Sequence, residues 1–404
     1  MVIGVIGGGA SGMMAALYAS RAADVILYER QARLGRKLMA TGNGRCNLSN
    51  RAASVRHYHG VDPGFTRPAL ERFGVDETLA FFRTLGLLTA DEPDGKIYPF
   101  SDQANSVSDV LRLALEHSRA ELRLGCEITE LRREGSGFTV RYDGGEDRLD
   151  RVIVAAGGLA GGKLGGTGAG YDLLKSLGHR CTKLYPALVQ LRTDNTWVRA
   201  CKGIRAQAKV SLLQGDAVLA LETGEVQFTD FGISGPCVFS LARACAGRNG
   251  LTAALDLCPC LDAEEIREHL RARCERFPDL ALEDLLTGLL HNRLGRTVLR
   301  SLGFSLAQCC GSLSGRDRSR IAGGIKDFRL PVLGPVDLSQ AQVTAGGIAT
   351  ADFDPDTLES RLVPGLYATG EVLDIDGDCG GFNLQWAWSS GALAGTSACG
   401  EGKP

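Results

Sequence analysis

The sequence predicts an α/β protein in which one domain is discontinuous along the chain and carries a β-rich and a helical insert. The first thirty residues contain an apolar strand, a glycine-rich turn, a helix of small residues and a second strand. From about residue 191 the pattern changes to short strands, and a helical pattern follows at 262–320. Glycine-rich segments return at 342–385. Because 404 residues are too many for one ordinary core, we expect two or three domains.

The first βαβ unit has the spacing of a dinucleotide-binding motif. Gly7 permits a tight turn after the strand Val2–Ile6, Gly9 lets backbone approach a pyrophosphate, and Gly12 lets helix and strand pack closely. The helix N-terminus directs N–H groups and partial positive charge at the phosphates. Glu29 follows Gly9 by twenty residues, which suits a carboxylate that accepts hydrogen bonds from ribose hydroxyls. The motif predicts a bound dinucleotide and does not by itself separate FAD from NAD.

The loop Gly35–Asn47 follows the second strand and combines cations, glycines, amides and a hydroxyl. One interpretation is a loop whose backbone and cations contact a phosphate or flavin. The other is a solvated basic loop, and composition alone supports both equally. Its position directly after Glu29 favours a role at the cofactor.

Helices and strands are expected between this loop and residue 158. Apolar residues at helical spacing predict a helix over 76–88, capped by Asp76, and a second helix that begins at Ser106. Alternating residues and two glycine turns predict several strands over 122–154. The last of these strands ends in the small residues 155–158, so a ligand can lie against its end. The later segment Gly165–Gly170 is spaced GxxGxG, so we expect no separate NAD(P)H-binding unit.

The middle of the chain predicts short strands at 210–213, 218–221, 226–228 and 251–257, followed by helices over 262–320. Gly232–Pro236 partly matches a hydrolase nucleophile turn, but Pro236 stands where the final glycine is needed. We therefore interpret Ser234 as the cap of a helix over 236–244. Asp262 and Glu265 form a plausible capping pair for the next helix.

The C-terminal part predicts a return to the first domain. Gln342–Ile348 has the pattern of a strand and turn, and Leu366–Glu371 that of a strand ending in a carboxylate. Gly380–Gln385 then leads into a helix of small residues.

The composition limits the function classes. The chain is 44% apolar and 23% charged with a net charge of −2, which is typical of a globular protein and argues against a nucleic-acid or membrane partner. No apolar run has transmembrane length and no signal peptide is recognised. The 13 cysteines lack a CxxC pair, so we expect reduced thiols in a cytoplasmic protein and no metal site. His57 and His59 share a strand face if extended, but we interpret them as solvated loop histidines rather than metal ligands.

The chain resembles BaiN-type NAD(P)/FAD-dependent oxidoreductases and the related aminoacetone-oxidase-type flavoproteins. The matching segments are residues 7–12, 29, 35–47, 185–188, 231–236, 346–348, 370–374 and 380–385. The resemblance covers nearly the whole chain. It implies a discontinuous Rossmann-like FAD-binding domain of the two-dinucleotide-fold flavoprotein type, with inserted β-barrel-like and helical domains. The expected boundaries are 1–190 for the first part of the FAD-binding domain, 191–261 for the β-rich domain, 262–320 for the helical domain, 321–335 for the return and 336–404 for the second part.

The resemblance also implies a set of cofactor contacts along the whole FAD molecule. The pyrophosphate, adenosine ribose, adenine, ribityl chain and isoalloxazine each receive some of them. The expected FAD-binding residues are Gly7, Gly9, Ala10, Ser11, Gly12, Glu29, Arg30, Arg36, Lys37, Thr41, Gly42, Asn43, Arg45, Cys46, Ile128, Ala156, Gly157, Gly370, Glu371, Gly381, Phe382, Asn383 and Leu384. One departure from the family pattern is the pair Asp378–Cys379 before the glycines, which places Cys379 near the flavin without assigning it a role.

Three functions are weighed on this basis. The leading hypothesis is an NAD(P)H-fed flavin reductase of a small unsaturated organic substrate, with NADH or NADPH as a transient donor. An amine or aminoketone oxidase that uses oxygen is the alternative reaction. A flavoprotein that acts on RNA is the alternative of another class, and the net charge speaks against it. Catalytic acid and base residues, the substrate and the oligomeric state are not assigned.

Overall fold

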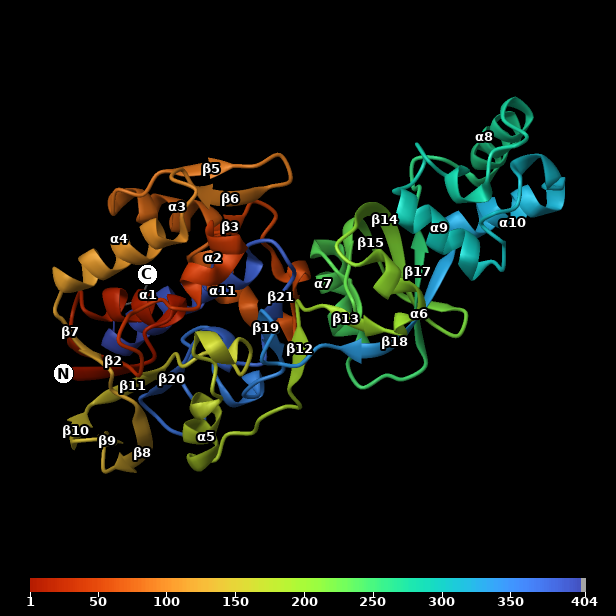
Figure 1. The fold of residues 1–404 in the computed structure, drawn as a ribbon. Coiled ribbons are helices and arrows are strands. Elements are labelled where there is room, and N and C mark those ends of the chain that lie inside the picture. Colours follow the sequence, from red (N-terminus) through yellow and green to blue (C-terminus); the bar gives the residue numbers. More distant parts are fainter. Residues whose placement is uncertain (401–404) are drawn as a thin grey trace. The chain divides into compact units, whose positions relative to one another are not determined.

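The computed structural model describes residues 1–400, which divide into two compact units (Figure 1). Unit 1 contains residues 1–185 and the chain that follows residue 337, and unit 2 contains residues 186–337. The mixed α/β class and the discontinuity of the first domain are therefore confirmed. The residue-level domain boundaries given above stay predictions.

A parallel sheet of five strands forms the centre of unit 1, in the order β20-β11-β1-β2-β7. The chain runs outward from β1 through β2 and β7, and later fills the other side with β11 and β20. In open parallel sheets, such a reversal beside the first strand leaves a crevice at the carboxyl ends of the strands. The strands are β1 (Val2–Ile6), β2 (Asp24–Glu29), β7 (Ala120–Leu124), β11 (Arg151–Val154) and β20 (Leu366–Ala368).

Two helices of small residues, α1 (Ala10–Ala19) and α11 (Phe382–Cys399), pack closely against each other. A Cβ atom on Gly391 would lie 2.5 Å from the Ser11 carbonyl oxygen, and one on Gly395 would lie 2.4 Å from that of Ala15. The contacting residue numbers rise by four in both helices, from Ser11 to Ala15 in α1 and from Gly391 to Gly395 in α11. The helices are therefore parallel, and their N-termini point the same way.

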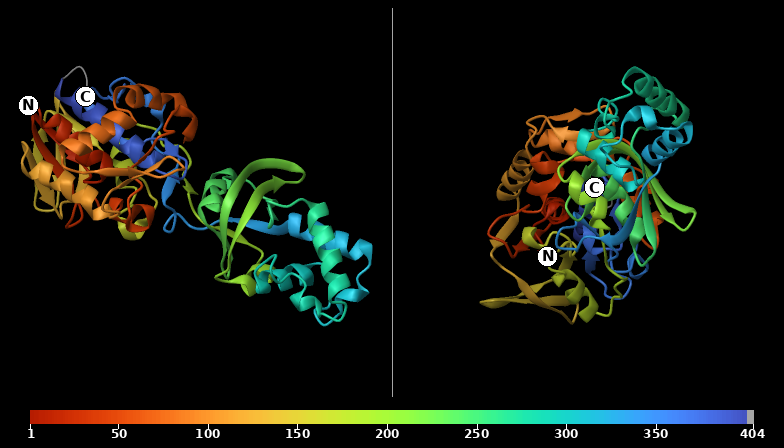
Figure 2. Two further views of the ribbon diagram at one scale, coloured as in Figure 1. Left: turned by 90° about the horizontal axis from the view of Figure 1, so that it is seen from above. Right: turned by 45° about the vertical axis from the view of Figure 1, so that its right-hand side comes forward.

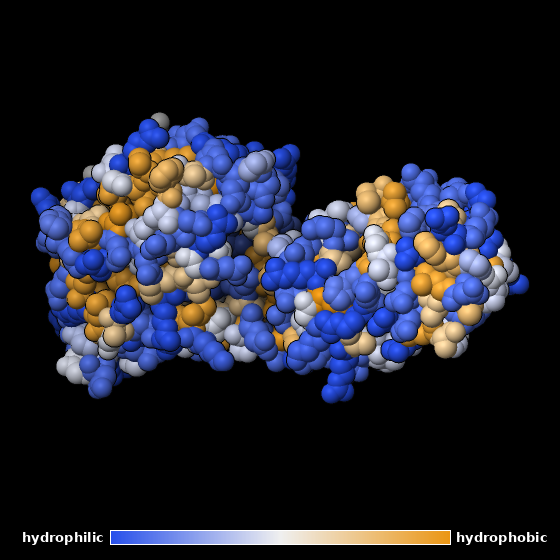
Figure 3. Space-filling view, turned by 45° about the horizontal axis from the view of Figure 1, so that its top comes forward, coloured by the Kyte–Doolittle hydropathy of each residue, from blue (hydrophilic) through white to orange (hydrophobic). Residues whose placement is uncertain are grey.

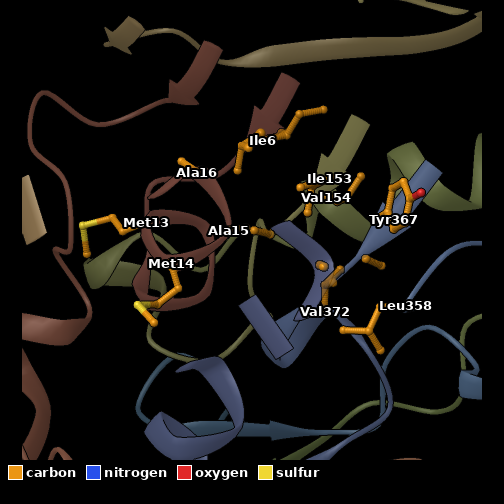
Figure 4. Close-up of a cluster of buried hydrophobic side chains, with 14 of the residues drawn as sticks. Ile6, Met13, Met14, Ala15, Ala16, Ile153, Val154, Leu358, Tyr367 and Val372 are labelled. Carbon is orange, nitrogen blue, oxygen red and sulfur yellow. The ribbon is translucent and has the colours of Figure 1, made fainter. Parts of the chain in front are cut away.

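The core of unit 1 lies between α1, α11 and the central sheet. Figure 4 shows side chains of α1 beside those of β1, β11 and β20, including Ala15, Ile6, Ile153 and Tyr367, all of which are buried. Glycine and alanine at the α1–α11 contact let the two helix backbones approach, which brings the C-terminal helix under the first βαβ unit.

Smaller elements surround this core. The sheet β10-β9-β8 is antiparallel, as is β3-β6-β5, and β4 pairs with β21. Their bounds are β3 (Ser49–Asn50), β4 (Tyr58–His59), β5 (Thr89–Asp91), β6 (Lys96–Pro99), β8 (Ile128–Glu134), β9 (Gly137–Tyr142), β10 (Gly145–Leu149) and β21 (Asp376–Gly377). The remaining elements of this part of the chain are α2 (Arg67–Arg72), α3 (Val75–Thr84), α4 (Ala104–Glu116), α5 (Ala169–Ser176), β12 (Tyr185–Ala187) and β19 (Val343–Ala345).

Unit 2 contains a closed antiparallel barrel in the order β13-β16-β15-β14-β17-β18, which confirms the predicted β-barrel-like insert. The long β14–β15 hairpin is labelled in Figure 1 and is one of several green segments in Figure 2. The barrel strands are β13 (Leu191–Thr193), β14 (Arg205–Gln214), β15 (Ala217–Phe228), β16 (Gly232–Ser234), β17 (Leu251–Asp256) and β18 (Phe328–Pro335). The helices are α6 (Asn195–Val198), α7 (Pro236–Ala242), α8 (Ala263–Arg276), α9 (Asn292–Ser301) and α10 (Gly315–Lys326).

The predicted helical segment between β17 and β18 is confirmed by α8, α9 and α10. At the start of α8 the Asp262 carboxylate accepts a hydrogen bond from Glu265 N at 2.8 Å, and Glu265 accepts one from Asp262 N at 2.7 Å. The capping pair is therefore present as predicted.

Three details of the predicted elements are wrong. The helix expected over 76–88 is α3, which begins after Gly74 because the Glu77 side chain accepts the Gly74 N–H, and which ends before the left-handed Gly86. Ser234 does not cap α7, since it is a buried strand residue and Gly235, at φ +114, is the N-cap. The strands expected at 218–221 and 226–228 are one continuous strand, β15.

On the face that Figure 3 shows, hydrophilic residues cover much of each unit, with apolar patches among them. No helix within residues 1–400 has the length and apolar character that a membrane span would need.

Candidate cofactor site

Expected cofactor residues that are far apart in sequence meet at one edge of the central sheet of unit 1. Gly7 follows β1, Glu29 ends β2, Ala156 and Gly157 follow β11, and Gly370 follows β20. Since all five strands are parallel, these carboxyl ends lie at the same edge, beside the point where the strand order reverses.

Each of the three glycines of the first turn is needed for a different structural reason. Gly7 has φ +109, and a Cβ atom there would lie 2.5 Å from the Ala155 carbonyl oxygen. A Cβ atom on Gly12 would lie 1.8 Å from the Gly7 carbonyl oxygen, so Gly12 is required for packing. A Cβ atom on Gly9 would meet no protein atom within 4 Å. The cradle beside Gly9 is thus open to a ligand, as the pyrophosphate hypothesis requires.

Helix α1 begins at Ala10, with Gly9 as its N-cap and no side chain as a cap. The first N–H groups of a helix have no partner within the helix, so those of Ala10, Ser11 and Gly12 can bind an anion. Ser11 lies next to the second cofactor segment, because a Cβ atom on Gly370 would be 2.5 Å from its hydroxyl oxygen.

Glu29 stands at the mouth of this turn. Its Oε2 accepts a hydrogen bond from Gly8 N and its Oε1 accepts one from Gln31 N, both at 2.7 Å. A carboxylate has about four lone-pair sites, so these two bonds leave acceptor capacity for ribose hydroxyls. The bonds also give Glu29 a second role that was not predicted, which is to hold the glycine turn.

The expected adenine side lies next to Glu29. Backbone hydrogen bonds join Cys126 N to the Glu29 carbonyl and Gly125 N to the Gln31 carbonyl, and the buried Ile128 follows. The Arg30 side chain lies 3.7 Å from Glu127, and its buried Nε has no partner among the described residues. This buried donor is available to a polar group of the ligand.

Lys37 and Glu371 meet at the expected ribityl side. Lys37 Nζ lies 2.6 Å from Glu371 Oε2, and Glu371 Oε1 accepts the Thr344 N–H at 2.8 Å. Burial, with a contribution from the Glu371 carboxylate, raises the pKa of the neighbouring Tyr171 phenol, whose buried hydroxyl has no partner among residues 1–400. The sequence did not reveal Thr344 or Tyr171, because neither belongs to a recognised motif.

The loop after β2 is only partly directed at this edge. Arg36 donates a hydrogen bond to the Gln31 side chain at 2.6 Å, close to Glu29. Arg45 instead pairs with Glu92 at 2.9 Å and with Asp102, and its guanidinium stacks on Tyr98. Its charge is therefore already neutralised, which the basic-loop hypothesis did not anticipate.

The rest of the loop is a 3-10 segment, Leu38–Gly44, with a break in its middle. Thr41 donates its hydroxyl to the Leu38 carbonyl, and Gly42 and Asn43 both have φ +56. Cys46 is fully buried, and burial raises the pKa of its thiol to about 12, so it stays protonated near neutral pH.

Helix α11 begins at Phe382, with Gly381 as its N-cap and again no side chain as a cap. Asn383 accepts a hydrogen bond from Gly377 N and donates one to the Gly377 carbonyl, both at 2.8 Å, while Leu384 is half-buried. A Cβ atom on Gly381 would lie 2.3 Å from the Ser49 carbonyl oxygen. The need for glycine here is thus set by the protein backbone.

Two histidines beside this helix start were interpreted as solvated, and that interpretation is wrong. His57 Nδ1 lies 2.9 Å from Asp378 Oδ2, and His59 Nε2 lies 2.7 Å from Asp378 Oδ1. Burial acts to raise the pKa of Asp378, but the hydrogen bonds from His59 and His57 outweigh it and hold that pKa below its usual value. The sequence contained both halves of this cluster, but nothing in it indicated that they meet.

The geometry fits FAD along its length. The helices α1 and α11 present uncapped N-termini in the same direction. In the α1–α11 alignment, α11 begins about eight residues before the level of Ala10, so its N-terminus projects about 12 Å beyond that of α1 at 1.5 Å per residue. A pyrophosphate at the first N-terminus and a flavin ring near the second would use both. Within residues 1–400 no three His, Cys, Asp or Glu side chains are arranged to hold a metal ion.

Known proteins match this chain over nearly its whole length. The HI0933-like protein Rossmann domain matches residues 1–397. The chain is 41% identical to a 3-dehydro-bile acid delta(4,6)-reductase of Clostridium scindens, over 98% of each protein. It is 29% identical to a ribosomal RNA dihydrouridine synthase of Escherichia coli, over 96% of this chain and 95% of the relative.

Among solved structures, 3-ketosteroid delta1-dehydrogenase from Sterolibacterium denitrificans has a TM-score of 0.55 and 14% identity, covering 98% of this chain and 99% of its own. At that identity the likeness concerns the fold.

Proposed function

We propose that this chain, which belongs to the HI0933-like Rossmann-domain family, reduces a carbon–carbon double bond conjugated to a carbonyl group. The family expected from the sequence is confirmed, and the chain is an FAD-dependent oxidoreductase. Bound FAD supplies hydride chemistry, while the protein supplies orientation and electrostatics.

The observation that carries the proposal is the parallel pair of uncapped helix N-termini at one edge of the sheet. The N–H groups of α1 bind the pyrophosphate, and Glu29 binds the adenosine ribose. The N–H groups of α11 stabilise negative charge that develops on a reduced ring more than they stabilise the neutral oxidised ring. Lys37 and Glu371 fix the segment between them.

The names of the relatives support a carbon–carbon double bond conjugated to a carbonyl as the bond that is reduced. A delta(4,6)-reductase of a 3-dehydro bile acid and a synthase of dihydrouridine both saturate a double bond that is conjugated to a carbonyl. The higher identity and coverage of the first relative lead us to a steroid-like acid as the substrate. We infer NADH or NADPH as the transient electron donor, and the chain's place in the cell as the cytoplasm.

A second candidate is RNA, supported by the 29% identity to the rRNA dihydrouridine synthase over almost the full length. Against it stands the net charge of −2, since most RNA-binding domains are basic. An oxidase of amines or aminoketones is the third candidate, carried only by the sequence resemblance.

The test starts with protein loaded with FAD and reduced anaerobically by light. Addition of a 3-oxo-4,6-diene bile acid should reoxidise the flavin and remove the diene absorbance in equal amounts. The same reduced protein is mixed with an unmodified rRNA transcript, and the oxidised protein with an aminoketone and oxygen. Reoxidation by RNA alone, or turnover of the aminoketone alone, would overturn the proposal.

A further inference from the structure

A cluster of three polar side chains lies beside the start of α11 and has no part in the expected cofactor contacts. It consists of His57, His59 and Asp378, which we call the histidine–aspartate cluster. His59 lies in β4, which pairs with β21 directly before Asp378. Asp378 thus accepts hydrogen bonds from His59 on β4 and from His57, which lies directly before that strand, one on each carboxylate oxygen.

His57 is fully committed within the protein. Its Nε2 accepts a hydrogen bond from Arg56 Nε at 3.1 Å, so its Nδ1 carries the proton that it donates to Asp378. Its ring stacks on Phe382 at 4.4 Å between centroids. His57 is therefore held between the carboxylate and the first residue of α11.

His59 has the opposite character. Its Nε2 donates to Asp378 at 2.7 Å, while the described residues give its Nδ1 no partner. Its side chain is 35% exposed. His59 can therefore hold a proton on Nδ1 and pass it to a ligand.

Charged and titratable groups around the cluster have hydrogen-bond or ion-pair partners of their own. Asp374 accepts a hydrogen bond from Val61 N, and Lys96 pairs with Asp94. Burial raises the pKa of the Tyr58 phenol, which donates to the Phe382 carbonyl and stays neutral. The titratable and charged groups on the elements packed around the cluster are Arg56, Tyr58, Asp94, Lys96, Asp374, Asp376 and Cys379.

The cluster also lies where the reduced ring is expected. The His57 ring stacks on Phe382. Phe382 is the first residue of α11, and we expect the isoalloxazine to lie near the start of this helix. Asn383 bridges back to the carbonyl of Asp378 at 3.3 Å. His59 therefore belongs to a cluster that is joined to the first two residues of this helix.

We propose that His59 is the acid that protonates the substrate, with Asp378 and His57 as positioning residues. This inference rests on the proposed function. Hydride with its electron pair comes from the reduced cofactor and forms a C–H bond at the carbon β to the carbonyl, as the π bond breaks. The proton from His59 Nδ1 forms the second C–H bond at the α carbon. His59 is left neutral and regains a proton from solvent, so the double bond is reduced and the cofactor is oxidised.

The test compares His59→Gln with the wild type in single turnover, using light-reduced protein and a 3-oxo-4,6-diene bile acid. Loss of a general acid typically slows proton transfer by about 100-fold to 10,000-fold, and we expect reoxidation to slow in this range. Reoxidation by oxygen needs no substrate protonation by His59 and should stay unchanged. FAD content per protein should also stay unchanged. His117→Gln, directly after α4, is the matched control and should behave as the wild type.

A second readout does not depend on turnover. In Asp378→Asn the imidazole nitrogen NMR signals of His59, read at one fixed pH, should move, because the ring then bonds a neutral amide instead of a carboxylate. His57→Gln should slow substrate reoxidation by less than His59→Gln does.

The outcomes separate the two proposals. If wild-type protein is not reoxidised by the diene, the proposed function is wrong and this inference is overturned with it. If the wild type reacts and His59→Gln reacts equally fast, only the role of His59 is overturned. Unmoved His59 imidazole signals in Asp378→Asn overturn the positioning role of Asp378.

Discussion

Lys37 Nζ lies 2.6 Å from Glu371 Oε2, an ion pair between residues that are 334 positions apart. It joins the loop after β2 to the segment after β20, so it connects the two chain segments of unit 1. Glu371 also accepts the Thr344 N–H, so three segments converge on one carboxylate. The protein itself therefore fixes the expected ribityl side of the site.

The first prediction concerns this ion pair. Lys37→Met should weaken FAD retention and lower the stability of the protein by about 1 kcal/mol, because Glu371 loses its charged partner. Thermal unfolding and the FAD-to-protein ratio after dialysis measure the two effects. Lys175→Met removes a more exposed pair on α5 and should change neither. Equal effects of both variants would mean that the Lys37 pair has no special role.

The second prediction separates two glycines of the same turn. Gly9→Ala should fold normally, because its Cβ atom meets no protein atom within 4 Å, yet should bind FAD more weakly. Gly12→Ala should be strongly destabilised, since its Cβ atom would lie 1.8 Å from a carbonyl oxygen. Circular dichroism melting and FAD titration distinguish the two. Full FAD affinity in Gly9→Ala would remove the pyrophosphate from this position.

Much of the fold followed from short-range patterns. The first βαβ unit, the strand ending at Val154 and the helical insert were all predictable, because periodicity and glycine spacing are local properties. Where the predictions were wrong, a single contact decided, local in the first case and tertiary in the second. Glu77 fixes the start of α3 at Gly74, and the tight approach of Gly235 to β15 places Ser234 in a strand.

The candidate site shows the same division. Residues in glycine motifs could be named from the sequence, whereas partners without a motif could not. Arg45 was expected at the cofactor, but Asp102 and Glu92 take its charge, and no spacing rule links these three positions. The meeting of His59 with Asp378 likewise depends on the pairing of β4 with β21, which lie more than 300 residues apart in the chain.

The third prediction concerns Glu29. Glu29→Lys should lower FAD retention, since a hydrogen bond to a charged group is worth about 1.5–3 kcal/mol. The structure adds a small loss of stability, because Gly8 N and Gln31 N lose their acceptor. Glu29→Gln keeps one acceptor oxygen and should lie between the wild type and Glu29→Lys in both measurements. Unchanged FAD occupancy in Glu29→Lys would place the ribose elsewhere.

The fourth prediction is a pH dependence of stability. Because the pKa of Asp378 is lower in the folded protein than in the unfolded chain, its contribution is present above the unfolded pKa of about 4 and is lost on further acidification. Asp378→Asn should therefore be less stable than the wild type at pH 6, and the difference should shrink as the pH falls to 3. Urea unfolding at the two pH values checks this. A difference that grows on acidification would contradict the assigned sign.

The last prediction concerns the start of α11, where Gly381 has φ +100 and its Cβ position lies 2.3 Å from the Ser49 carbonyl oxygen. Gly381→Val must shift the backbone at this point, because an L side chain rarely adopts this conformation and the contact is with backbone. The shift moves the first N–H groups of α11, which should stabilise the reduced ring. We therefore expect lower FAD affinity and a lower flavin midpoint potential, measured by dye-coupled titration. Gly400→Val is the control, since it is also left-handed but lies at the other end of the same helix with open space around its Cβ position. If Gly381→Val retains FAD fully with an unchanged potential while its melting temperature falls, this segment supports only the fold and the flavin ring does not lie against it.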